Sequence, residues 1–426
     1  SRWGRAYMAI RESEVAARVS GVNAYGYKVS AFALSAGIVG VAGWLGAQRF
    51  VLVSSQVATP DQSFRYVIMV AVGGMGTLAG PVIGAFAFSF GFAITWVQNT
   101  FRDYQGLLYG TLGLLAVATA PEGTVGNLRR LARAYQLRRA KRGAALRTAS
   151  IPDVAPELQR PAVRERSDAE GNGVVLHVSG LTKRFGGVAA LSEVDLVVER
   201  GTVHALIGPN GSGKTTFINV VTGLYKPTAG RIDLDGESLE GLSPAVRSRR
   251  GVARTFQNLQ LWRRMTVLEN VMVGAHARER VGLVQSLLRT PKARRAERHL
   301  SERAWGLLHF VGLAGRGRDL AGTLAFADMR RLEIARALAS DPEILLLDEP
   351  AAGMQVSEIH DLADLIRQVR DAGVTVLLIE HHMDLVMGLS DRVSVLDYGQ
   401  KIAEGSPAEV RHDARVVAAY LGEETA

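Results

Sequence analysis

The chain has 426 residues, with 50 Lys and Arg against 41 Asp and Glu, and it contains no cysteine. The absence of cysteine excludes disulfides, thiolate metal ligands and a cysteine nucleophile, and it leaves the redox compartment undetermined. Residues 1–150 hold 16 basic against 5 acidic side chains, a net charge of +11, whereas the remaining 276 residues carry a net charge of −2. The length exceeds one ordinary core, so we expect two or three domains.

Three long uncharged runs predict membrane segments within residues 1–128. The run from Val29 to Gln48 has 20 residues, the length that crosses a hydrocarbon core, and its many small residues favour close helix packing. A second run, Tyr66 to Phe101, is interrupted by Gly73–Pro81, and a third extends from Tyr104 to Pro121. Buried helices of a soluble protein are the alternative, but soluble cores rarely need three such runs.

Positive charge flanks these runs and predicts a cytoplasmic location for both ends. Residues 129–147 hold eight Lys and Arg and no acid. An even number of crossings then requires the middle run to form a re-entrant or tight helical hairpin broken at Gly73–Pro81, with an ordinary extracytoplasmic turn as the alternative. Basic residues after a span serve more simply to meet anionic headgroups than to bind nucleic acid, so we expect no nucleic-acid partner.

The start of the chain and the segment before residue 174 have no globular pattern of their own. The chain begins at Ser1 with no secretory signal, so we expect further sequence upstream. Residues 129–173 are predicted to be a basic juxtamembrane segment and a flexible linker, because 151–173 is rich in Pro and Gly without apolar periodicity.

From Val174 onward, short apolar strands alternate with helical patterns. This alternation predicts an α/β domain with a parallel sheet over residues 174–426. The predicted fold class is therefore multidomain, with an all-α membrane segment followed by an α/β domain.

A phosphate-binding loop is predicted directly after the apolar strand Val203–Ile207. Its sequence fits G-x-x-x-x-G-K-[ST] and leads into a stretch with helical spacing. Backbone N–H groups of such a loop converge on phosphates, while Lys214 adds a positive charge and Thr215 a hydroxyl for Mg²⁺. This predicts a site for a nucleoside triphosphate with Mg²⁺. The predicted nucleotide-binding residues of the loop are Gly208, Pro209, Asn210, Gly211, Ser212, Gly213, Lys214, Thr215 and Thr216.

A pair of carboxylates follows a second apolar strand. Four apolar residues, 344–347, lead into Asp348 and Glu349. At the carboxyl end of a buried strand beside the phosphate loop, Asp348 can hold Mg²⁺ through water and Glu349 can polarise the attacking water. Alone this pattern is weak, but together with the phosphate loop it is a strong indication of nucleotide hydrolysis.

These two motifs occur together with three others in the order found in one family. The others are Arg254–Gln257, Leu324–Leu338 and Ile379–His381. In this order the whole domain resembles the ATPase of an ABC transporter, which implies an ABC ATPase fold with P-loop chemistry.

The resemblance implies roles for four side chains. Phe185 is similar to the aromatic residue that stacks on adenine, and Gln257 to the glutamine that reaches Mg²⁺ and the attacking water. Glu349 is similar to the catalytic carboxylate, and His381 to the histidine that contacts the γ-phosphate. The alternatives are a core phenylalanine, a solvated glutamine and a structural histidine.

Within that family, the likeness is to high-affinity branched-chain amino acid importers. Thr255–Asn258, the insertion around Leu287–Pro291 and the ending Glu404–Pro407 are similar to the ATPases of these systems. Gly4–Glu14 and Gly73–Pro81 look like their permease. The resemblance thus implies a fusion of two subunits.

The predicted function is an importer component that couples ATP hydrolysis to uptake of branched-chain amino acids or a related small polar solute. We expect a multi-pass protein of the bacterial inner membrane with a cytoplasmic ATPase domain. The amphipathic helix expected at Ala6–Val19 is implied to dock on an ATPase groove. The implied partners are a second ATPase subunit in a heterodimer, a partner permease, an extracytoplasmic solute-binding protein and the small-molecule substrate. Urea, amides and carboxylates stay open as substrates, and a soluble or regulatory ABC-type ATPase is the alternative function.

The signature turn departs from the family's usual Leu-Ser-Gly-Gly-Gln, or its relative with Tyr at the third place. Ala325 replaces the serine, Phe326 the third residue, Ala327 a glycine and Asp328 the glutamine. The resemblance assigns this turn to the γ-phosphate held by the opposite subunit, where an added carboxylate should weaken binding. We therefore expect an asymmetric pair in which the site completed by Leu324–Asp328 is impaired. Alternatively, the main-chain N–H groups of the turn suffice.

Overall fold

The computed structural model describes residues 1–49, 60–74, 79–92, 111, 152, 154, 161, 173–278 and 281–421. The chain forms two compact units: residues 1–32 with 151–426, and residues 33–150. The first two helices therefore belong to the same unit as the C-terminal domain.

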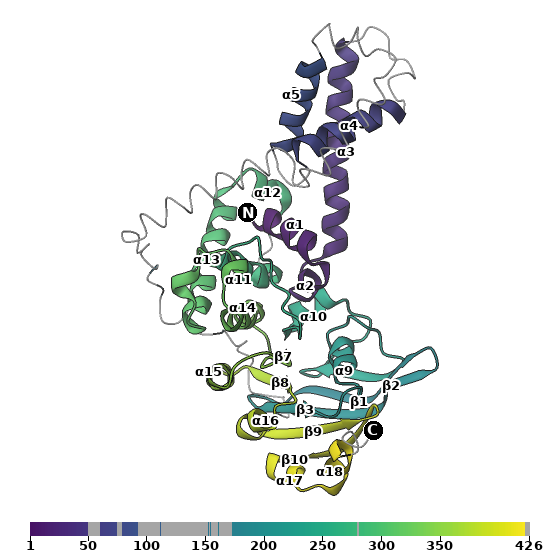
Figure 1. Ribbon diagram of the computed structural model, residues 1–426, viewed down its shortest axis with the longest axis vertical. Helices are drawn as coiled ribbons and strands as arrows, with labels where there is room; N and C mark the ends of the chain where they lie inside the picture. The colour runs from purple at the N-terminus through teal and green to yellow at the C-terminus, as the bar shows by residue number, and fades with distance from the viewer. Residues whose placement is uncertain are drawn as a thin grey trace. The chain divides into compact units, whose positions relative to one another are not determined.

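A six-stranded sheet forms the centre of the larger unit, in the order β10-β9-β3-β8-β7-β6 (Figure 1). Its strands are parallel except β10, which runs antiparallel to β9. The parallel α/β arrangement expected after Val174 is thus confirmed. The strands are β3 (Val203–Ile207), β6 (Val252–Arg254), β7 (Ile344–Asp348), β8 (Thr375–Ile379), β9 (Arg392–Asp397) and β10 (Gln400–Gly405).

The second sheet of this unit is antiparallel and packs on one face of the first. Its order is β2-β1-β4-β5. Along β7, Ile344 and Leu346 join the core beneath this second sheet, whereas Leu345 and Leu347 join the core on the opposite face. The alternation follows from the period of two of a strand and explains why every residue of β7 is buried. The strands are β1 (Val174–Phe185), β2 (Val188–Glu199), β4 (Ala229–Leu234) and β5 (Glu237–Ser238).

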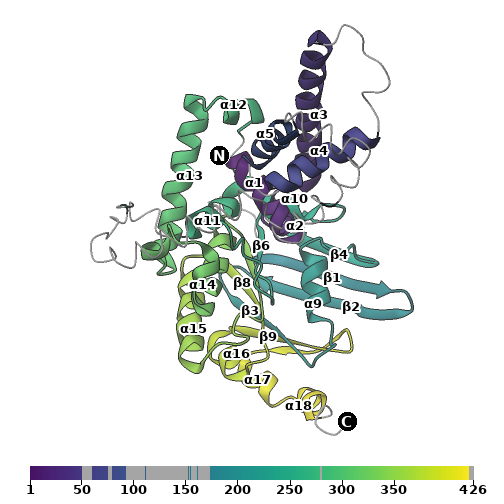
Figure 2. The same cartoon turned by 45° about the horizontal axis from the view of Figure 1, so that its top comes forward.

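Helices cover the two faces of the parallel sheet. Figure 2 shows α14 and α15 on one side and α9 with the antiparallel sheet on the other. The helices are α9 (Lys214–Val221), α10 (Pro244–Arg250), α11 (Val267–Gly274), α12 (Leu283–Leu287), α13 (Pro291–Phe310), α14 (Phe326–Leu338), α15 (Val356–Asp371), α16 (Met383–Leu389), α17 (Pro407–Arg411) and α18 (Ala414–Leu421), with 3₁₀ turns at Ala275–Ala277, Ala314–Arg316 and Ala321–Thr323.

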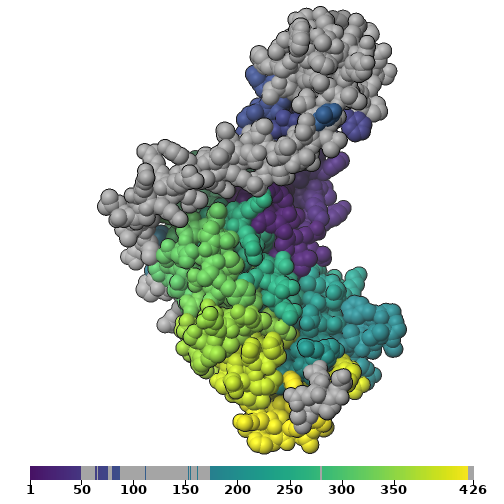
Figure 3. Space-filling model, in the orientation of Figure 1, coloured from purple at the N-terminus to yellow at the C-terminus, as the bar shows by residue number. Residues whose placement is uncertain are grey.

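The start of the chain packs on this domain as two short helices, α1 (Arg2–Glu12) and α2 (Glu14–Val19). The prediction of a single helix at Ala6–Val19 is therefore wrong in one respect, because the helix is interrupted at Ser13. Ser13 is extended, with φ −153° and ψ 104°, and its hydroxyl accepts a hydrogen bond from the N–H of Ala16, so it caps α2. In Figure 3 these N-terminal residues lie directly against the body of the domain.

The smaller unit contains most of α3 (Ala24–Arg49), α4 (Pro60–Gly73) and α5 (Gly80–Phe92). Among the described residues, the stretch Ala24–Gln48 of α3 is the one helix long and apolar enough to cross a membrane. Helices α4 and α5 have 14 and 13 residues and lie side by side, with α4 ending and α5 beginning inside the predicted break. At about 1.5 Å per residue, neither alone reaches across a hydrocarbon core.

Other predicted segments lie mainly outside the described residues. The run Tyr104 to Pro121 is described only at Thr111, and the basic residues 129–147 are not described. Of the predicted linker 151–173, Val154 is buried in the main core of the domain.

Candidate nucleotide site and its link to the N-terminal helices

The predicted phosphate loop connects β3 to α9 and is built on three glycines with positive φ. Gly208 has φ 148° and Gly213 has φ 103°. A Cβ at Gly208 would lie 2.0 Å from the carbonyl oxygen of Leu396, and one at Gly213 would lie 2.5 Å from that of Ala190. Only glycine fits at these two positions, because both the backbone conformation and the close approach exclude a side chain.

Gly213 caps α9 without a side-chain hydrogen bond, so the first N–H groups of α9 face the loop unsatisfied by a cap. The ammonium of Lys214 donates hydrogen bonds to the carbonyl oxygens of Gly208, at 2.6 Å, and Pro209, at 2.7 Å. Thr215 is exposed in the first turn of the helix. Positive charge and the N–H groups of a helix N-terminus thus gather at one place, an arrangement that suits a polyphosphate.

Asp348 ends β7 in a buried ion pair that the sequence does not predict. Its Oδ2 lies 3.0 Å from Nη2 of Arg254, and both side chains are almost fully buried. Arg254 also donates to Oδ1 of Asn219 on α9, which packs against β7. Burial raises the pKa of Asp348 above its ordinary value, although Arg254 opposes this shift. The pair therefore fixes the carboxylate beside α9, the helix that follows the phosphate loop.

The predicted catalytic residues gather around the next carboxylate. Nε2 of Gln257 donates a 2.7 Å hydrogen bond to Oε2 of Glu349, and Nδ1 of His381 lies 3.9 Å from the same oxygen. Glu349 has φ 46°, a left-handed conformation that costs a non-glycine residue about 1–2 kcal/mol. Such strain is typical of functional positions. The structure thus brings together Gln257, Glu349 and His381, although Gln257 lies 92 residues before Glu349 and His381 lies 32 residues after it.

Phe185 lies at the end of β1 with 44% of its surface exposed. Its ring meets Tyr225 edge-on at 5.3 Å, and Nζ of Lys183 lies 4.7 Å above it. Strand β2 of the same hairpin contacts the phosphate loop, since the carbonyl of Ala190 lies against Gly213. An exposed aromatic face beside a phosphate loop is available for stacking. The sequence does not reveal Tyr225 as its neighbour.

A group of potential metal ligands, Glu380, His381 and His382, lies next to these residues. Both carboxylate oxygens of Glu380 are already engaged: Oε1 accepts from the N–H of Ala351 at 2.7 Å, and Oε2 accepts from the N–H groups of His381 and His382. Glu380 therefore holds the loops that carry Glu349 and His381, and its geometry suits a structural role.

Helix α14 holds the Gln257 loop through three buried charged residues that sequence reasoning missed. Arg330 donates to the carbonyl oxygens of Phe256, at 2.7 Å, and Gln257, at 3.1 Å. Glu333 accepts from the N–H of Phe256, and it also pairs with Arg330 and Arg336. The signal was available in the sequence, because charges spaced by three residues share one helix face.

The same loop meets the N-terminal helices. Trp262 is fully buried with Ala6 and Ala9, and its indole donates to the carbonyl of Ala9 at 3.0 Å. The hydroxyl of Ser13 donates to Oε1 of Gln260 at 3.0 Å. Helices α1 and α2 are therefore seated on the loop that begins at Gln257.

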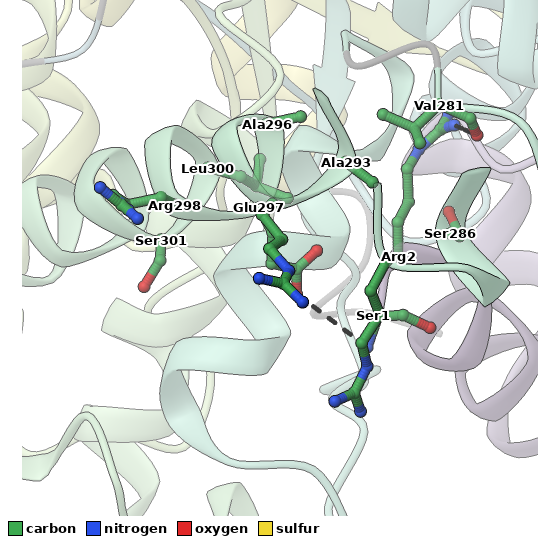
Figure 4. A pocket seen from close by; sticks show the side chains of 12 residues that line it. Ser1, Arg2, Val281, Ser286, Ala293, Ala296, Glu297, Arg298, Leu300 and Ser301 are labelled. Carbon is green, nitrogen blue, oxygen red and sulfur yellow. Dashed lines mark hydrogen bonds and ion pairs between the residues drawn. The ribbon is translucent and has the colours of Figure 1, made fainter. Parts of the chain in front are cut away.

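Further contacts join α1 to the α12–α13 hairpin. Arg5 forms a bidentate ion pair with Glu297, and Arg2 donates a hydrogen bond to the carbonyl of Val281 at 3.0 Å. A cavity of about 570 Å³ lies between these elements (Figure 4). None of its lining residues belongs to the phosphate loop, so it is separate from the nucleotide site.

The signature turn occupies the start of α14. Ala325 is the N-cap, with φ −66° and ψ 160°, and offers no side-chain cap. Phe326 is 43% exposed, and Oδ2 of Asp328 lies 3.5 Å from Nη1 of Arg316. Arg316 therefore offsets part of the negative charge that Asp328 adds to this turn.

The parallel sheet, the phosphate loop after β3 and the carboxylate pair after β7 define the protein as an ATP-binding cassette (ABC) ATPase, a nucleotide-binding enzyme. A sequence-family model described as "ABC transporter" matches residues 191–352. The ATP-binding protein LivG of Salmonella typhimurium, named for high-affinity branched-chain amino acid transport, is 48% identical over 250 residues, which is 58% of this chain and 98% of the relative. The chain belongs to the family of branched-chain amino acid transport ATP-binding proteins.

Other relatives and solved structures agree with this family. BraF of Pseudomonas aeruginosa, an ATP-binding protein of the same kind of transport, is also 48% identical over 250 residues, with the same coverage. The crystal structure of a nucleotide-free ATP-binding cassette from an ABC transporter is similar, with a TM-score of 0.52 and 34% identity, over 58% of this chain and 98% of that one. The crystal structure of the ADP conformation of an ATP-binding cassette of an ABC transporter is also similar, with a TM-score of 0.52 and 35% identity. This match covers 58% of this chain and 99% of that one.

The two ends of the chain match family models of the same transport systems. "Branched-chain amino acid transport system / permease component" matches residues 1–117, and "Branched-chain amino acid ATP-binding cassette transporter" matches residues 400–426. The predicted fusion of a permease segment with an ATPase is thus confirmed, and the permease segment associates the chain with a membrane.

Proposed function

We propose that this chain drives the uptake of branched-chain amino acids, or of a related small polar solute, across a bacterial inner membrane. The observation that carries the proposal is the seating of α1 and α2, from the permease segment, on the loop of the ATPase domain that begins at Gln257. Movement of that loop during hydrolysis is thereby passed to the membrane segment. The ATPase domain lies in the cytoplasm, and the permease segment crosses the membrane more than once.

In this proposal each predicted site residue has a definite task. Phe185 stacks on adenine, and the loop from Gly208 to Thr216 with Lys214 binds the phosphates. Glu349 polarises the attacking water, which Gln257 orients, and His381 binds the γ-phosphate. The hydrogen bond between Gln257 and Glu349 supports this assignment, since it holds the amide beside the carboxylate.

Mg²⁺ fits the residues present at this site. Oδ1 of Asp348 is buried and has no hydrogen-bond partner among the described residues, while Oδ2 is paired with Arg254. A buried carboxylate oxygen needs a partner, and a hydrated cation supplies one. Asp348, Gln257 and the Thr215 hydroxyl would hold the ion, which neutralises phosphate charge when bound.

The transporter needs further subunits, in our proposal a second ATPase, a partner permease and an extracytoplasmic binding protein. The ATPase pair is asymmetric. The phosphate loop of this chain works against the partner's signature, whereas the site completed by Leu324–Asp328 is impaired by its missing hydroxyl and added carboxylate. The domain boundaries proposed are 1–128, 129–173 and 174–426.

The test is solute uptake by the complete chain reconstituted in proteoliposomes with its neighbouring permease, ATPase and binding protein. We expect ATP-dependent uptake of radiolabelled leucine, isoleucine or valine, and loss of about 10²–10³-fold of ATP turnover at this site in Glu349→Gln. The same change at the exposed Glu302 of α13 is the control and should leave turnover intact. Uptake of urea, a short amide or a carboxylate in place of these amino acids would reassign the solute. Unchanged hydrolysis in Glu349→Gln would assign catalysis to the partner.

A further inference from the structure

The turn between α12 and α13 combines exposed cations with exposed apolar side chains. We define the α12–α13 tip as residues 284–298. Val284, Leu287 and Leu288 are 66%, 72% and 69% exposed. Five basic side chains lie exposed beside them: Arg289, Lys292, Arg294, Arg295 and Arg298.

The charge of the tip is not used within the described part of the chain. None of its five cations forms an ion pair with a described residue. The single acid of the tip, Glu297, is turned toward α1, where it pairs with Arg5. Figure 4 shows Glu297 directed to Ser1, with Arg298 extending from α13 on the other side. The tip therefore presents a surface of nearly uncompensated positive charge.

The tip is fixed on the side of the domain from which the chain continues into α3. Helix α12 contacts α1, and both Arg2 and the indole of Trp3 donate hydrogen bonds to the carbonyl of Val281, just before α12. Helix α1 leads through α2 to the first turns of α3 in the same unit (Figures 1 and 2). Tyr27, in the first turn of α3, is hydrogen-bonded to His276, whose carbonyl accepts from the same Arg2. Since α3 is the candidate membrane span, the tip and the start of that span are held by one set of contacts.

We propose that the α12–α13 tip binds the anionic phospholipid headgroups of the membrane surface, with its three apolar side chains in the interfacial layer. Exposed leucine and valine next to several Arg and Lys is the combination found in surface-bound amphipathic segments. A protein partner is the weaker fit, because the centres of protein interfaces are depleted in charged residues, especially Lys. The proposal rests on the membrane location of the chain, which fractionation of the unlabelled chain tests separately.

A fluorescent label tests the contact directly. The chain has no cysteine, so Leu288→Cys creates a unique site for an environment-sensitive dye in the otherwise native full chain, assembled with its partner subunits in nanodiscs. In membranes of mixed phosphatidylcholine and phosphatidylglycerol, we expect a blue-shifted emission that lipids with a nitroxide near the headgroup quench. Pure phosphatidylcholine should give weaker quenching. The control is Val356→Cys on α15, which is equally exposed, at 72%, and should show neither effect.

A charge variant tests the chemistry. Replacing Arg289, Lys292 and Arg295 by Gln in the labelled chain should weaken the membrane contact about fivefold for each cation removed, as estimated for a single cation near an anionic surface. The gain in quenching on adding phosphatidylglycerol should then disappear. Replacing the two arginines by Lys keeps the charge and should preserve that gain.

Two results would overturn the proposal. A blue-shifted label that lipid nitroxides do not quench would place the tip against a protein subunit. A label with the emission of Val356→Cys in both membranes would leave the tip in water. A chain that fractionates into the soluble pool would instead contradict the proposed function, so the two failures are distinguishable.

Discussion

The indole Nε1 of Trp262 donates a hydrogen bond to the backbone carbonyl of Ala9, over 3.0 Å. The guanidinium of Arg336 lies over the face of the same indole, 4.9 Å from the ring centre. Arg336 belongs to α14, which also holds the backbone of Gln257 through Arg330. A path of packed and hydrogen-bonded residues therefore connects Gln257, which is hydrogen-bonded to Glu349, to helix α1. The nucleotide site and α1 can thus both shift the loop that begins at Gln257.

The first prediction concerns this path. Trp262→Phe keeps an aromatic ring but removes the donor, so the carbonyl of Ala9 keeps only the hydrogen bond from the N–H of Ser13, at a net cost of about 0.5–1.5 kcal/mol. We expect nucleotide binding to persist, while the amount of solute moved per ATP hydrolysed falls severalfold in proteoliposomes. Trp305→Phe, in the core away from α1, is the matched control and should preserve that ratio. If Trp262→Phe moves as much solute per ATP hydrolysed as the wild type, this contact does not couple hydrolysis to transport.

The second prediction concerns the buried pair of Arg254 and Asp348. Arg254→Met leaves an uncompensated buried carboxylate and should reduce stability by about 3–5 kcal/mol, measured by thermal unfolding with and without nucleotide. Because the arginine opposes the burial that raises the pKa of Asp348, its loss should raise that pKa further and weaken Mg²⁺-dependent nucleotide binding as pH falls.

The matched control for this pair is Arg367→Met. Arg367 pairs with Asp364, and both side chains are exposed, at 42% and 66%. Solvent screens such a pair, so we expect a loss below about 1 kcal/mol. Equal destabilisation by the two variants would refute the assigned role of burial.

The motifs proposed to form the nucleotide site could be predicted from sequence because each is a short contiguous pattern on a known element. The strand Val203–Ile207 and the carboxylate pair at Asp348 are of this kind, and the structure places them as expected. The partner of Asp348 could not be found, since Arg254 is 94 residues away and pairing across β6 and β7 depends on strand order. The break at Ser13 was missed because amphipathic spacing continues through it.

The third prediction concerns the signature turn. Ala325 has the extended backbone of an N-cap, so Ala325→Ser should supply a capping hydroxyl and stabilise the ATPase domain by about 1 kcal/mol without nucleotide. Together with Ala327→Gly and Asp328→Gln, it should also raise the ATP turnover of the assembled complex. Ala325→Val is the control, since valine adds a side chain at the same position without a capping hydroxyl. A triple variant with greater stability but unchanged turnover would favour binding through main-chain N–H groups alone.

The fourth prediction concerns the contact between α4 and α5. A Cβ at Gly84 would lie 1.9 Å from the carbonyl oxygen of Met69, so Gly84→Ala must push the two helices apart. We expect loss of solute uptake with ATP binding intact. Gly40→Ala on α3 meets no described atom within 4 Å and should be tolerated. Uptake that survives Gly84→Ala would show that close packing of this hairpin is dispensable.

The fifth prediction is a loss of stability in acid, caused by two buried histidines. Burial lowers the pKa of His276 to about 3, with Arg2, Arg5 and Arg249 adding to the effect, and burial lowers that of His204 to about 4. In the unfolded chain both pKa values return to about 6.5. Below that pH the unfolded state binds protons that the native state excludes, so stability is complete above pH 6.5 and falls as the pH drops toward 4. Each histidine contributes a slope of about 1.4 kcal/mol per pH unit.

Because His276 is hydrogen-bonded to the hydroxyl of Tyr27, at 3.1 Å, its share of this loss belongs to the seating of the N-terminal segment on the ATPase domain. Thermal unfolding of the full chain between pH 7 and pH 5 should therefore show a shallower pH dependence in His276→Gln than in the wild type. His360→Gln, at an exposed histidine on α15, should leave the slope unchanged. If His276→Gln and the wild type lose stability equally on acidification, exclusion of a proton from His276 does not cause the loss of stability in acid.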